Sequence, residues 1–303
     1  MAEREAAVLA RDRSVRCSPE TDRSGARPTD ARAALLPQRS GCAPPATVGL
    51  RSSPEHVQCD QPVGVSPLEL TGERTLPDLP AENYWFQRHL VVYRWIAERC
   101  RGLDVVDMAC GEGYGTDVLA LRAARVTGVD ANPEAHEHAR AKYTRPGVRF
   151  VRDLVDRFPE PCDAVVFLQT IEHLNEPEGA LEHFRSVLRP GGVAYVSTPN
   201  VLTLAPEGAE HSGNPWHVHE YRAEEFRELC ESHFDEVRLL GLFHARLLRA
   251  HELALRAGWD RLHAKLGLTK PFYDRFTPAI STSDFALREG PLDGALDLVA
   301  VLR

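Results

Sequence analysis

Short apolar runs alternate with helical segments through the middle of the chain, and this alternation constrains the fold more than any other feature. Each run ends in a turn and is followed by a helical pattern, for example over 117–124 or 133–142. Apolar strands that alternate with helices form βαβ units, whose parallel strands are buried on both faces. The expected strands of this part are Val105–Met108, Arg125–Val129, Val148–Arg152, Ala164–Leu168 and Gly192–Ser197.

The C-terminal part of the sequence departs from this alternation. Glu236–Phe243 is predicted as a sixth strand and Leu296–Arg303 as a seventh, which would close the sheet as a hairpin. We therefore predict an α/β fold with a doubly wound, mostly parallel seven-stranded sheet whose last strand is antiparallel. The insertion 244–295 would leave the carboxyl end of the sixth strand and lie over the side where an acceptor binds.

The N-terminal part has a different composition from the rest. Residues 1–65 are rich in Arg, Ala, Pro and Ser, contain no Lys, and show no sustained periodicity; the first aromatic residue of the chain is Tyr84. Such a segment buries too little apolar surface to offset its ordering entropy, so we expect a disordered tail over 1–65. The folded domain is expected over 66–303, with its first helix over 82–99.

Charge and cysteine content narrow the class of protein. The formal net charge of −8 argues against a general nucleic-acid binder, which needs a basic face. The seven cysteines are scattered and form no CxxC pair, which disfavours a disulfide framework and indicates a reducing compartment. The sequence opens without the apolar core of a signal peptide and holds no apolar stretch long enough to cross a bilayer. We therefore expect a cytoplasmic protein.

The segment VVDMACGEGYGT (105–116) carries the clearest ligand-binding pattern. It follows a predicted strand and opens a predicted helix, and its glycines at 111, 113 and 115 let the backbone approach a ligand closely. The helix start adds unpaired N–H groups and partial positive charge. Asp130 follows about twenty residues later at the tip of the second strand, where an acidic side chain accepts the hydroxyls of a ribose.

Two cofactors are compatible with this geometry. A nicotinamide enzyme would carry G-x-G-x-x-G to seat a pyrophosphate, whereas the spacing here is G-E-G-Y-G and Thr116 stands where the last glycine would fall. Asp107 precedes the turn, where its carboxylate would repel a phosphate and attract an amino group. The pattern therefore favours S-adenosylmethionine (SAM) over a dinucleotide.

A series of motifs strengthens this interpretation: VVDMACGEGYG, VTGVDANPEA, FVRDL, DAVVFLQTIEHL and LRPGGVAYVSTPN. Their order resembles that of the class I SAM-dependent methyltransferases over residues 103–200. The first glycine of the family's loop is Ala109 here, which we expect to be tolerated if its φ is negative. The resemblance implies that Asp107 and Gly111 face the methionine end of the cofactor, with Gly113 packing beneath it.

The same resemblance implies roles for residues at the ends of the next strands. Asp130 would bind the ribose and Ala131 would line the adenine. Asp153, with Leu154 beside it, would bind the adenine amino group. Gln169 would lie at the tip of the fourth strand, near the methionine part.

Histidines near the expected cofactor site are the candidates for activating an acceptor hydroxyl. Glu172-His173 follows the fourth strand, and His217 and His219 lie in NPWHVHEY after the fifth strand, where Glu220 could orient either ring. An imidazole suits the removal of a hydroxyl proton, and we expect His217 to act as the base, with His173 and His219 as alternatives. These rings also have other interpretations, as packing or loop residues. Two ligands one residue apart are weak support for a metal site, so we expect no metal.

The segment 70–89 combines aromatic residues with Arg88, and we expect Arg88 to pair with the methionine carboxylate. Together with STPN (197–200) and GLFH (241–244), this segment resembles methyltransferases associated with polymethylated glucan assembly, of the methylglucose lipopolysaccharide type. The resemblance implies O-methylation of a saccharide hydroxyl. The alternatives are a quinone, polyketide or other small-metabolite methyltransferase, a dinucleotide-dependent oxidoreductase, and a catalytically silent partner with the same fold.

Overall fold

The computed structural model describes residues 65, 68–69, 74–206 and 209–303 of the 303-residue chain. The tail expected over 1–65 lies outside these ranges, apart from Val65. Among the described residues, no helix combines the length and the apolar character needed to cross a membrane.

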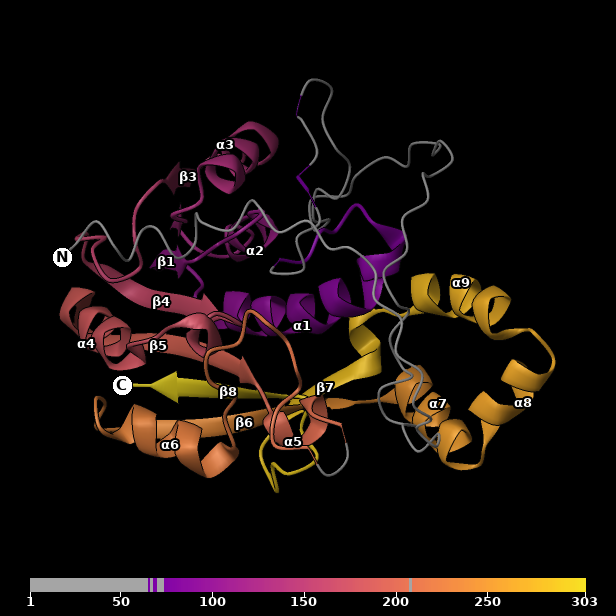
Figure 1. Ribbon diagram of the computed structural model, residues 1–303. Coiled ribbons are helices and arrows are strands. Elements are labelled where there is room, and N and C mark those ends of the chain that lie inside the picture. The colour runs from indigo at the N-terminus through magenta and orange to yellow at the C-terminus, as the bar shows by residue number, and fades with distance from the viewer. Residues whose placement is uncertain (1–64, 66–67, 70–73, 207–208) are drawn as a thin grey trace, which may run out of the picture. The chain divides into compact units, whose positions relative to one another are not determined.

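Eight strands form one sheet in the order β3-β2-β1-β4-β5-β8-β6-β7 (Figure 1). The first five strands pair in parallel, β8 lies antiparallel between β5 and β6, and β7 pairs antiparallel with the outer edge of β6. This arrangement confirms the predicted doubly wound, mostly parallel α/β fold with an antiparallel last strand. The strands are β1 Asp104–Met108, β2 Arg125–Val129, β3 Val148–Val151, β4 Cys162–Leu168, β5 Leu188–Pro199, β6 Val237–His244, β7 Phe285–Arg288 and β8 Asp297–Leu302.

The predicted count of seven strands is wrong by one, because β7 lies inside the segment 244–295 that the sequence analysis treated as an insertion. This strand is the four-residue segment FALR, and only Phe285 is buried. An edge strand with little buried surface shows no apolar run, so its pattern does not separate it from a loop. Its pairing with β6, from Gly241–Arg288 to His244–Phe285, is what defines it.

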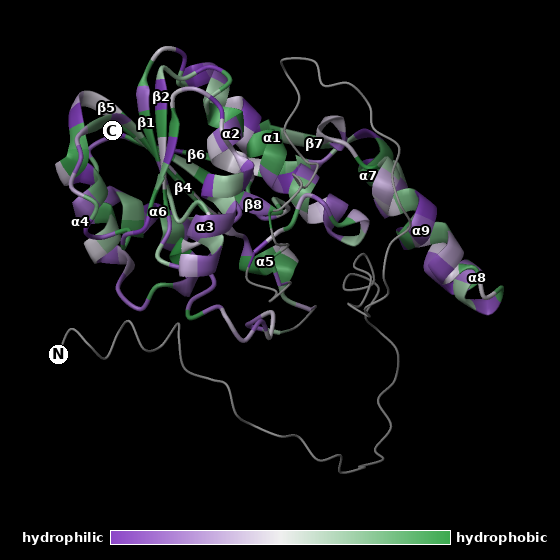
Figure 2. Ribbon diagram, turned by 90° about the horizontal axis from the view of Figure 1, so that it is seen from above, coloured by the Kyte–Doolittle hydropathy of each residue, from purple (hydrophilic) through white to green (hydrophobic). Residues whose placement is uncertain are grey.

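Helices cover both faces of the sheet, and the alternation of side chains along the strands assigns each face to its helices. On β4, Ala164, Val166 and Leu168 belong to the core that contains α1 and α2 residues, whereas Val165 and Phe167 belong to the core that contains α4 and α6 residues. Figure 2 shows polar and apolar residues alternating along α4, as expected of a helix with one buried side. The helices are α1 Asn83–Arg99, α2 Tyr114–Leu119, α3 Pro133–Lys142, α4 Pro177–Val187, α5 Val201–Leu204, α6 Ala223–Glu231, α7 Arg246–Arg256, α8 Trp259–Lys265 and α9 Thr269–Ala279, with 3-10 turns η2 Pro80–Glu82, η3 Ile171–His173 and η4 Thr282–Asp284.

A buried ion pair joins α1 to the start of β8. Arg88 donates from Nε to Oδ2 of Asp297 at 2.8 Å and from Nη2 to Oδ1 at 2.5 Å, and Nη2 also donates to the carbonyl of Leu296 at 2.8 Å. The two side chains are only 5% and 1% exposed. Both charged groups lose their hydration on folding. The pair of hydrogen bonds from the guanidinium to the carboxylate compensates for that loss.

We expect single replacements of this pair, Arg88→Met or Asp297→Asn, to lower the free energy of unfolding by about 3–5 kcal/mol, because each leaves one buried charge without its partner. The double variant should lose less than the sum of the two single variants. Urea unfolding of the four proteins measures both quantities. Additive losses would show that the pair does not contribute as a unit.

Candidate functional site

The loop after β1 is wrapped around Asp130. Gly111 donates its backbone N–H to Oδ2 of Asp130 at 2.7 Å, and Asn132 donates its backbone N–H to Oδ1 at 2.9 Å. Ala109, Gly111 and Gly113 have φ values of 55°, 56° and 99°, which turn the chain sharply between β1 and α2. These contacts join the ends of β1 and β2. The Asp130 side chain stays partly exposed at the tip of β2.

The expectation that Ala109 keeps a negative φ is wrong. Its φ of 55° lies in the left-handed region, where the Cβ of an L-residue approaches the carbonyl oxygen and costs about 1–2 kcal/mol. The reversal of the chain directly after β1 imposes this conformation, whatever residue stands there. The turn is therefore formed with an alanine at a position where glycine would avoid this cost.

The two following glycines face different surroundings. A Cβ placed on Gly111 would meet no atom within 4 Å, so this side of the loop is open, whereas a Cβ on Gly113 would approach the Cβ of Ala139 in α3 to 2.8 Å. Gly113 is therefore required for packing, and Gly111 borders open space beside Asp130. An open backbone cradle next to a partly exposed carboxylate fits an adenosine-containing ligand.

A buried network that the sequence analysis missed fixes this loop to α3. Glu112 is 2% exposed and accepts hydrogen bonds from Lys142 Nζ at 2.7 Å, from Tyr143 Oη at 2.7 Å and from the backbone N–H of Tyr114 at 3.2 Å. His138 Nε2 lies 3.0 Å from the same carboxylate. His138 and Lys142 are four residues apart, so they share one face of α3. This spacing was the sequence signal from which the two residues could have been predicted to act on one partner.

Asp107 lies beneath the loop and does not reach its open side. It is fully buried and accepts hydrogen bonds from Thr116 Oγ1 at 2.7 Å and from Tyr93 Oη at 3.2 Å. Burial raises the pKa of this carboxyl to about 7, against the effect of the two hydroxyl donors. The expectation that Asp107 faces the methionine end stays a prediction. Through these hydrogen bonds Asp107 ties α1 and α2 to the end of β1.

The remaining residues expected at the cofactor lie at the ends of β2, β3 and β4. Ala131, Asp153 and Leu154 are partly buried, and Asp153 Oδ1 accepts the backbone N–H of Leu154 at 2.8 Å. Gln169 has a φ of 53° and is held by Ser197, whose hydroxyl accepts from its side-chain Nε2 at 3.0 Å. These positions follow the carboxyl ends of neighbouring parallel strands, where ligands bind in open α/β sheets.

Arg88 has a different role from the one expected. Its Nε and Nη2 atoms are held by Asp297 and by the carbonyl of Leu296, and the residue is 4% exposed. A guanidinium that already forms a two-point contact with one carboxylate is poorly suited to bind the methionine carboxylate as well. We therefore assign Arg88 to the fold and not to cofactor binding.

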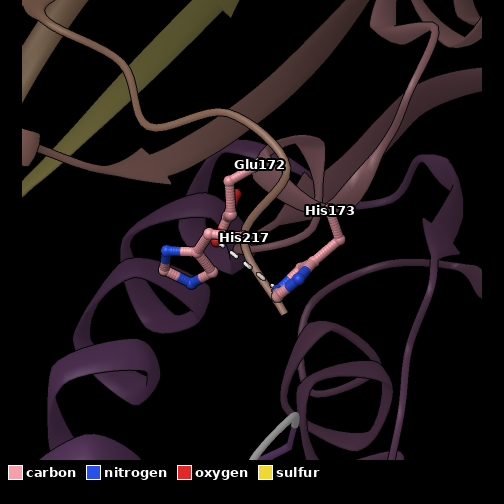
Figure 3. Close-up of side chains that lie close together, drawn as sticks. All are labelled: Glu172, His173 and His217. Atoms are coloured by element: carbon pink, nitrogen blue, oxygen red, sulfur yellow. Dashed lines mark ion pairs between the residues drawn. The ribbon is translucent and has the colours of Figure 1, made fainter. Parts of the chain in front are cut away.

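Glu172, His173 and His217 come together from two segments that are distant in sequence (Figure 3). Glu172 and His173 belong to η3, directly after β4, while His217 comes from the loop between α5 and α6. The carbonyl of Glu172 accepts the backbone N–H groups of Val218 at 2.8 Å and His219 at 3.1 Å, which fixes the loop against η3. The two imidazole ring centroids lie 5.1 Å apart.

Hydrogen bonds assign the same tautomer to both rings of this cluster. His173 Nδ1 lies 2.7 Å from the carbonyl oxygen of Trp216, and His217 Nδ1 lies 2.7 Å from Oε1 of Glu220. Both partners are acceptors, so each Nδ1 carries a proton and each Nε2 carries the lone pair. In His217 this lone pair faces the amide nitrogen of Asn214 at 2.9 Å.

The carboxyl group of Glu172 lies deep in this cluster. The residue is 1% exposed, Oε1 lies 4.0 Å from His173 Nε2, and Oε2 lacks a well-formed hydrogen bond, with the Thr198 hydroxyl nearby. Burial raises the pKa of Glu172 to about 8 because the charged form loses its hydration. Perturbed carboxyl groups of this kind concentrate at functional sites.

The structure separates His219 from the other two histidines. His219 is exposed, and its ring packs edge-on against Tyr221 at a centroid distance of 4.4 Å. Of the two loop histidines, it is His217 that pairs with Glu220, through Oε1. Burial opposes ionisation of Glu220, but hydrogen bonds from Ser212 and His217 lower its pKa, so this carboxylate is ionised near neutral pH.

Comparison with known proteins agrees with the geometry of the loop and sheet. Residues 74–250 match the methyltransferase domain family. A probable S-adenosylmethionine-dependent methyltransferase of Mycolicibacterium smegmatis is 43% identical over 248 residues, covering 78% of this chain and 95% of that protein. A probable S-adenosylmethionine-dependent methyltransferase of Mycobacterium tuberculosis is 37% identical over 267 residues, covering 82% of this chain and 96% of that protein.

A more distant similarity covers the central part of the chain. The ubiquinone biosynthesis O-methyltransferase of Pseudomonas syringae is 31% identical over 142 residues, covering 42% of this chain and 61% of that protein. The family match and the two mycobacterial relatives agree with the cofactor predicted from the glycine spacing and give no support to a dinucleotide enzyme. The chain belongs to the methyltransferase domain family and is an S-adenosylmethionine-dependent methyltransferase.

Proposed function

We propose that this methyltransferase transfers the methyl group of SAM to a hydroxyl oxygen, and that the acceptor is a saccharide. The observation that carries O-methylation is the pair of imidazoles, His173 and His217, each with a lone pair on Nε2 and each placed after a strand end at the rim of the sheet. A hydroxyl acceptor must lose a proton during the reaction, and a positioned imidazole suits that task.

The cofactor is proposed to lie along the ends of β1, β2, β3 and β4. Asp130 would accept the ribose hydroxyls beside the open side of Gly111, while Asp153 and the neighbouring Leu154 would contact the adenine. Ala131 would line the adenine. Gln169 would approach the methionine part, which places the sulfonium between the glycine loop and the histidine cluster.

The reaction proposed is an in-line displacement. A lone pair of the acceptor oxygen forms the new C–O bond while the C–S bond breaks, and its electron pair returns to sulfur. The hydroxyl proton leaves, so the products are a methyl ether, S-adenosylhomocysteine and one proton. Alignment of the two reactants supplies much of the acceleration in a displacement of this kind.

His217 is better suited than His219 to take this proton directly. Its Nδ1–H is held by an ionised Glu220, which fixes the ring and stabilises the imidazolium that forms. His173 remains the second candidate, because its ring lies beside His217 and is fixed by the Trp216 carbonyl.

The saccharide proposal rests on the loop that carries His217, in addition to the sequence resemblance. Trp216 is 45% exposed, beside Val218 at 55%, while the Trp216 carbonyl accepts a hydrogen bond from His173. An exposed indole next to a reactive group offers a flat apolar surface on which the C–H face of a sugar ring can stack. A quinone or other small aromatic metabolite is the second candidate, favoured by the partial similarity to a ubiquinone O-methyltransferase.

Replacement of Asp130 tests the cofactor site. Asp130→Asn should weaken SAM binding about 10–100-fold, because the charged acceptor of the ribose hydroxyls is lost. Isothermal titration calorimetry measures the dissociation constant, with Asp153→Asn as a comparison at the adenine end. Unchanged affinity in Asp130→Asn would remove the ribose assignment.

Replacement of His217 tests the proton acceptor. His217→Ala should lower kcat about 10²–10⁴-fold while the dissociation constant for SAM stays unchanged. His233→Ala, at the end of α6, is the matched control and should keep full turnover. Full turnover in His217→Ala would transfer the role to His173.

Methyl transfer from labelled SAM tests the acceptor. We expect label on short α-glucans and none on phenols or quinone precursors. Trp216→Ala should raise KM for the glucan about tenfold with SAM affinity unchanged, and Trp216→Phe should restore most of it because the flat surface is kept. Label found only on the aromatic compounds would replace the saccharide proposal with the second candidate.

A further inference from the structure

The cluster around Glu172 has the composition and the spacing of a metal site. One ligand atom from each of Glu172, His173 and His217 lies within 4.8 Å of the others. From the sequence we expected no metal, because His217 and His219, one residue apart, are weak support for a site. The structure turns His219 to the exterior and brings Glu172 and His173 in from the end of β4 instead.

The orientation of the two imidazoles supports this interpretation independently of their spacing. Histidines that bind metals present one nitrogen to the ion and donate the other ring N–H to a carboxylate or a backbone carbonyl. His217 donates to Glu220 and His173 donates to the carbonyl of Trp216, both at 2.7 Å. Both rings therefore have the supporting contacts of a ligand already in place, with the lone pair on Nε2.

The carboxylate supplies a third and separate observation. Glu172 is 1% exposed, and its Oε2 lacks a well-formed hydrogen bond, although the nearby Thr198 hydroxyl acts to lower its pKa. A buried polar oxygen without a partner is costly, and carboxylates in protein interiors are normally paired or bound to metals. The other oxygen, Oε1, lies 4.0 Å from His173 Nε2, so the carboxyl group of Glu172 borders the cluster.

We propose that Glu172, His173 and His217 bind a divalent cation of the first transition row, such as Mn²⁺ or Zn²⁺. Two imidazoles and one carboxylate suit these ions better than Mg²⁺ or Ca²⁺, which prefer ligand sets made of oxygen alone. Metal–ligand distances are about 2.0–2.2 Å, so side-chain shifts on the order of 1 Å would close the cluster around the ion.

With three protein ligands, the ion keeps open coordination positions that an acceptor hydroxyl can occupy. The ion's role in catalysis rests on the O-methylation proposed above. A hydroxyl that occupies an open position has its pKa lowered by the ion and releases its proton to solvent. The resulting oxygen lone pair attacks the methyl carbon as the C–S bond breaks. His217 then serves as a ligand, and its direct action as a base applies only to the metal-free enzyme.

Glu220 and Asn214 acquire distinct roles in this arrangement. Glu220 holds His217 through Nδ1 and is a positioning residue for the ion. Asn214 donates its amide N–H to Nε2 of His217 at 2.9 Å, so it competes with the ion for the same lone pair. Loss of the Asn214 side chain should therefore strengthen metal binding, an effect opposite to that of a merely structural residue.

Titration of the chelator-treated full-length protein with Mn²⁺, followed by electron paramagnetic resonance of the unbound ion, tests the site. We expect one ion per chain, at least tenfold weaker binding in Glu172→Gln and His173→Ala, about 10–100-fold weaker binding in Glu220→Gln, and wild-type binding in His233→Ala. SAM affinity measured on each variant reports whether it is folded. Wild-type Mn²⁺ affinity in both Glu172→Gln and His173→Ala would overturn the proposal.

Co²⁺ gives a second readout that does not depend on activity. Visible absorption typical of nitrogen ligation should develop on Co²⁺ addition to the wild-type protein and be lost in His217→Gln. Asn214→Ala should bind Mn²⁺ more tightly than the wild type. An absorption spectrum unaffected by His217→Gln would exclude this ring as a ligand and overturn the proposed set.

Methyl transfer separates the failure of this inference from the failure of the proposed function. If chelation lowers label transfer at least tenfold and Mn²⁺ restores it, the ion activates the hydroxyl. If transfer is unaffected by chelation, the ion's role is overturned while O-methylation stands. If Mn²⁺ binds as expected but no hydroxyl acceptor is labelled, the metal site stands and the proposed acceptor class fails.

Discussion

The buried ion pair between Arg88 and Asp297 is the constraint on which the rest of the site depends. It fastens α1 to the start of β8, so the helix lies across the face of the sheet that holds the α1 and α2 core. From that position α1 also supplies Tyr93, which donates to Asp107 beneath the cofactor loop. Because each buried charge is costly without its partner, this ion pair fixes the position of α1. The position of α1 in turn places Tyr93 over the end of β1.

The site itself is built where the carboxyl ends of the parallel strands meet. The proposed cofactor part includes local chain reversals after β1 and β4, at Ala109 and Gln169, and Asp130 after β2, which accepts a hydrogen bond from Gly111. The acceptor part depends on a contact between distant segments, because the carbonyl of Glu172 accepts two backbone N–H groups of the loop that carries His217. A tight turn thus shapes the proposed cofactor site, and a tertiary contact assembles the groups that we propose to act on the acceptor.

Particular residues show how far sequence reasoning reached. The strands β1, β2, β4 and β8 and the glycine turn after β1 were predicted, because buried strands and glycine turns leave local patterns. The positive φ of Ala109, the partner of Arg88 and the edge strand β7 were not. Each of these depends on contacts with residues far away in sequence, and a polar side chain does not reveal its partner through periodicity.

The order of residues along the chain was enough to predict the fold class, the cofactor and the histidines worth testing, since hydrophobic period and glycine spacing are local properties. Only the folded protein decided that Glu172 rather than His219 joins His173 and His217, and that Asp107 is buried. The physical reason is that burial and pairing are set by the packing of segments many residues apart. Sequence spacing therefore identified the chemical groups, and tertiary contacts selected which of them act together.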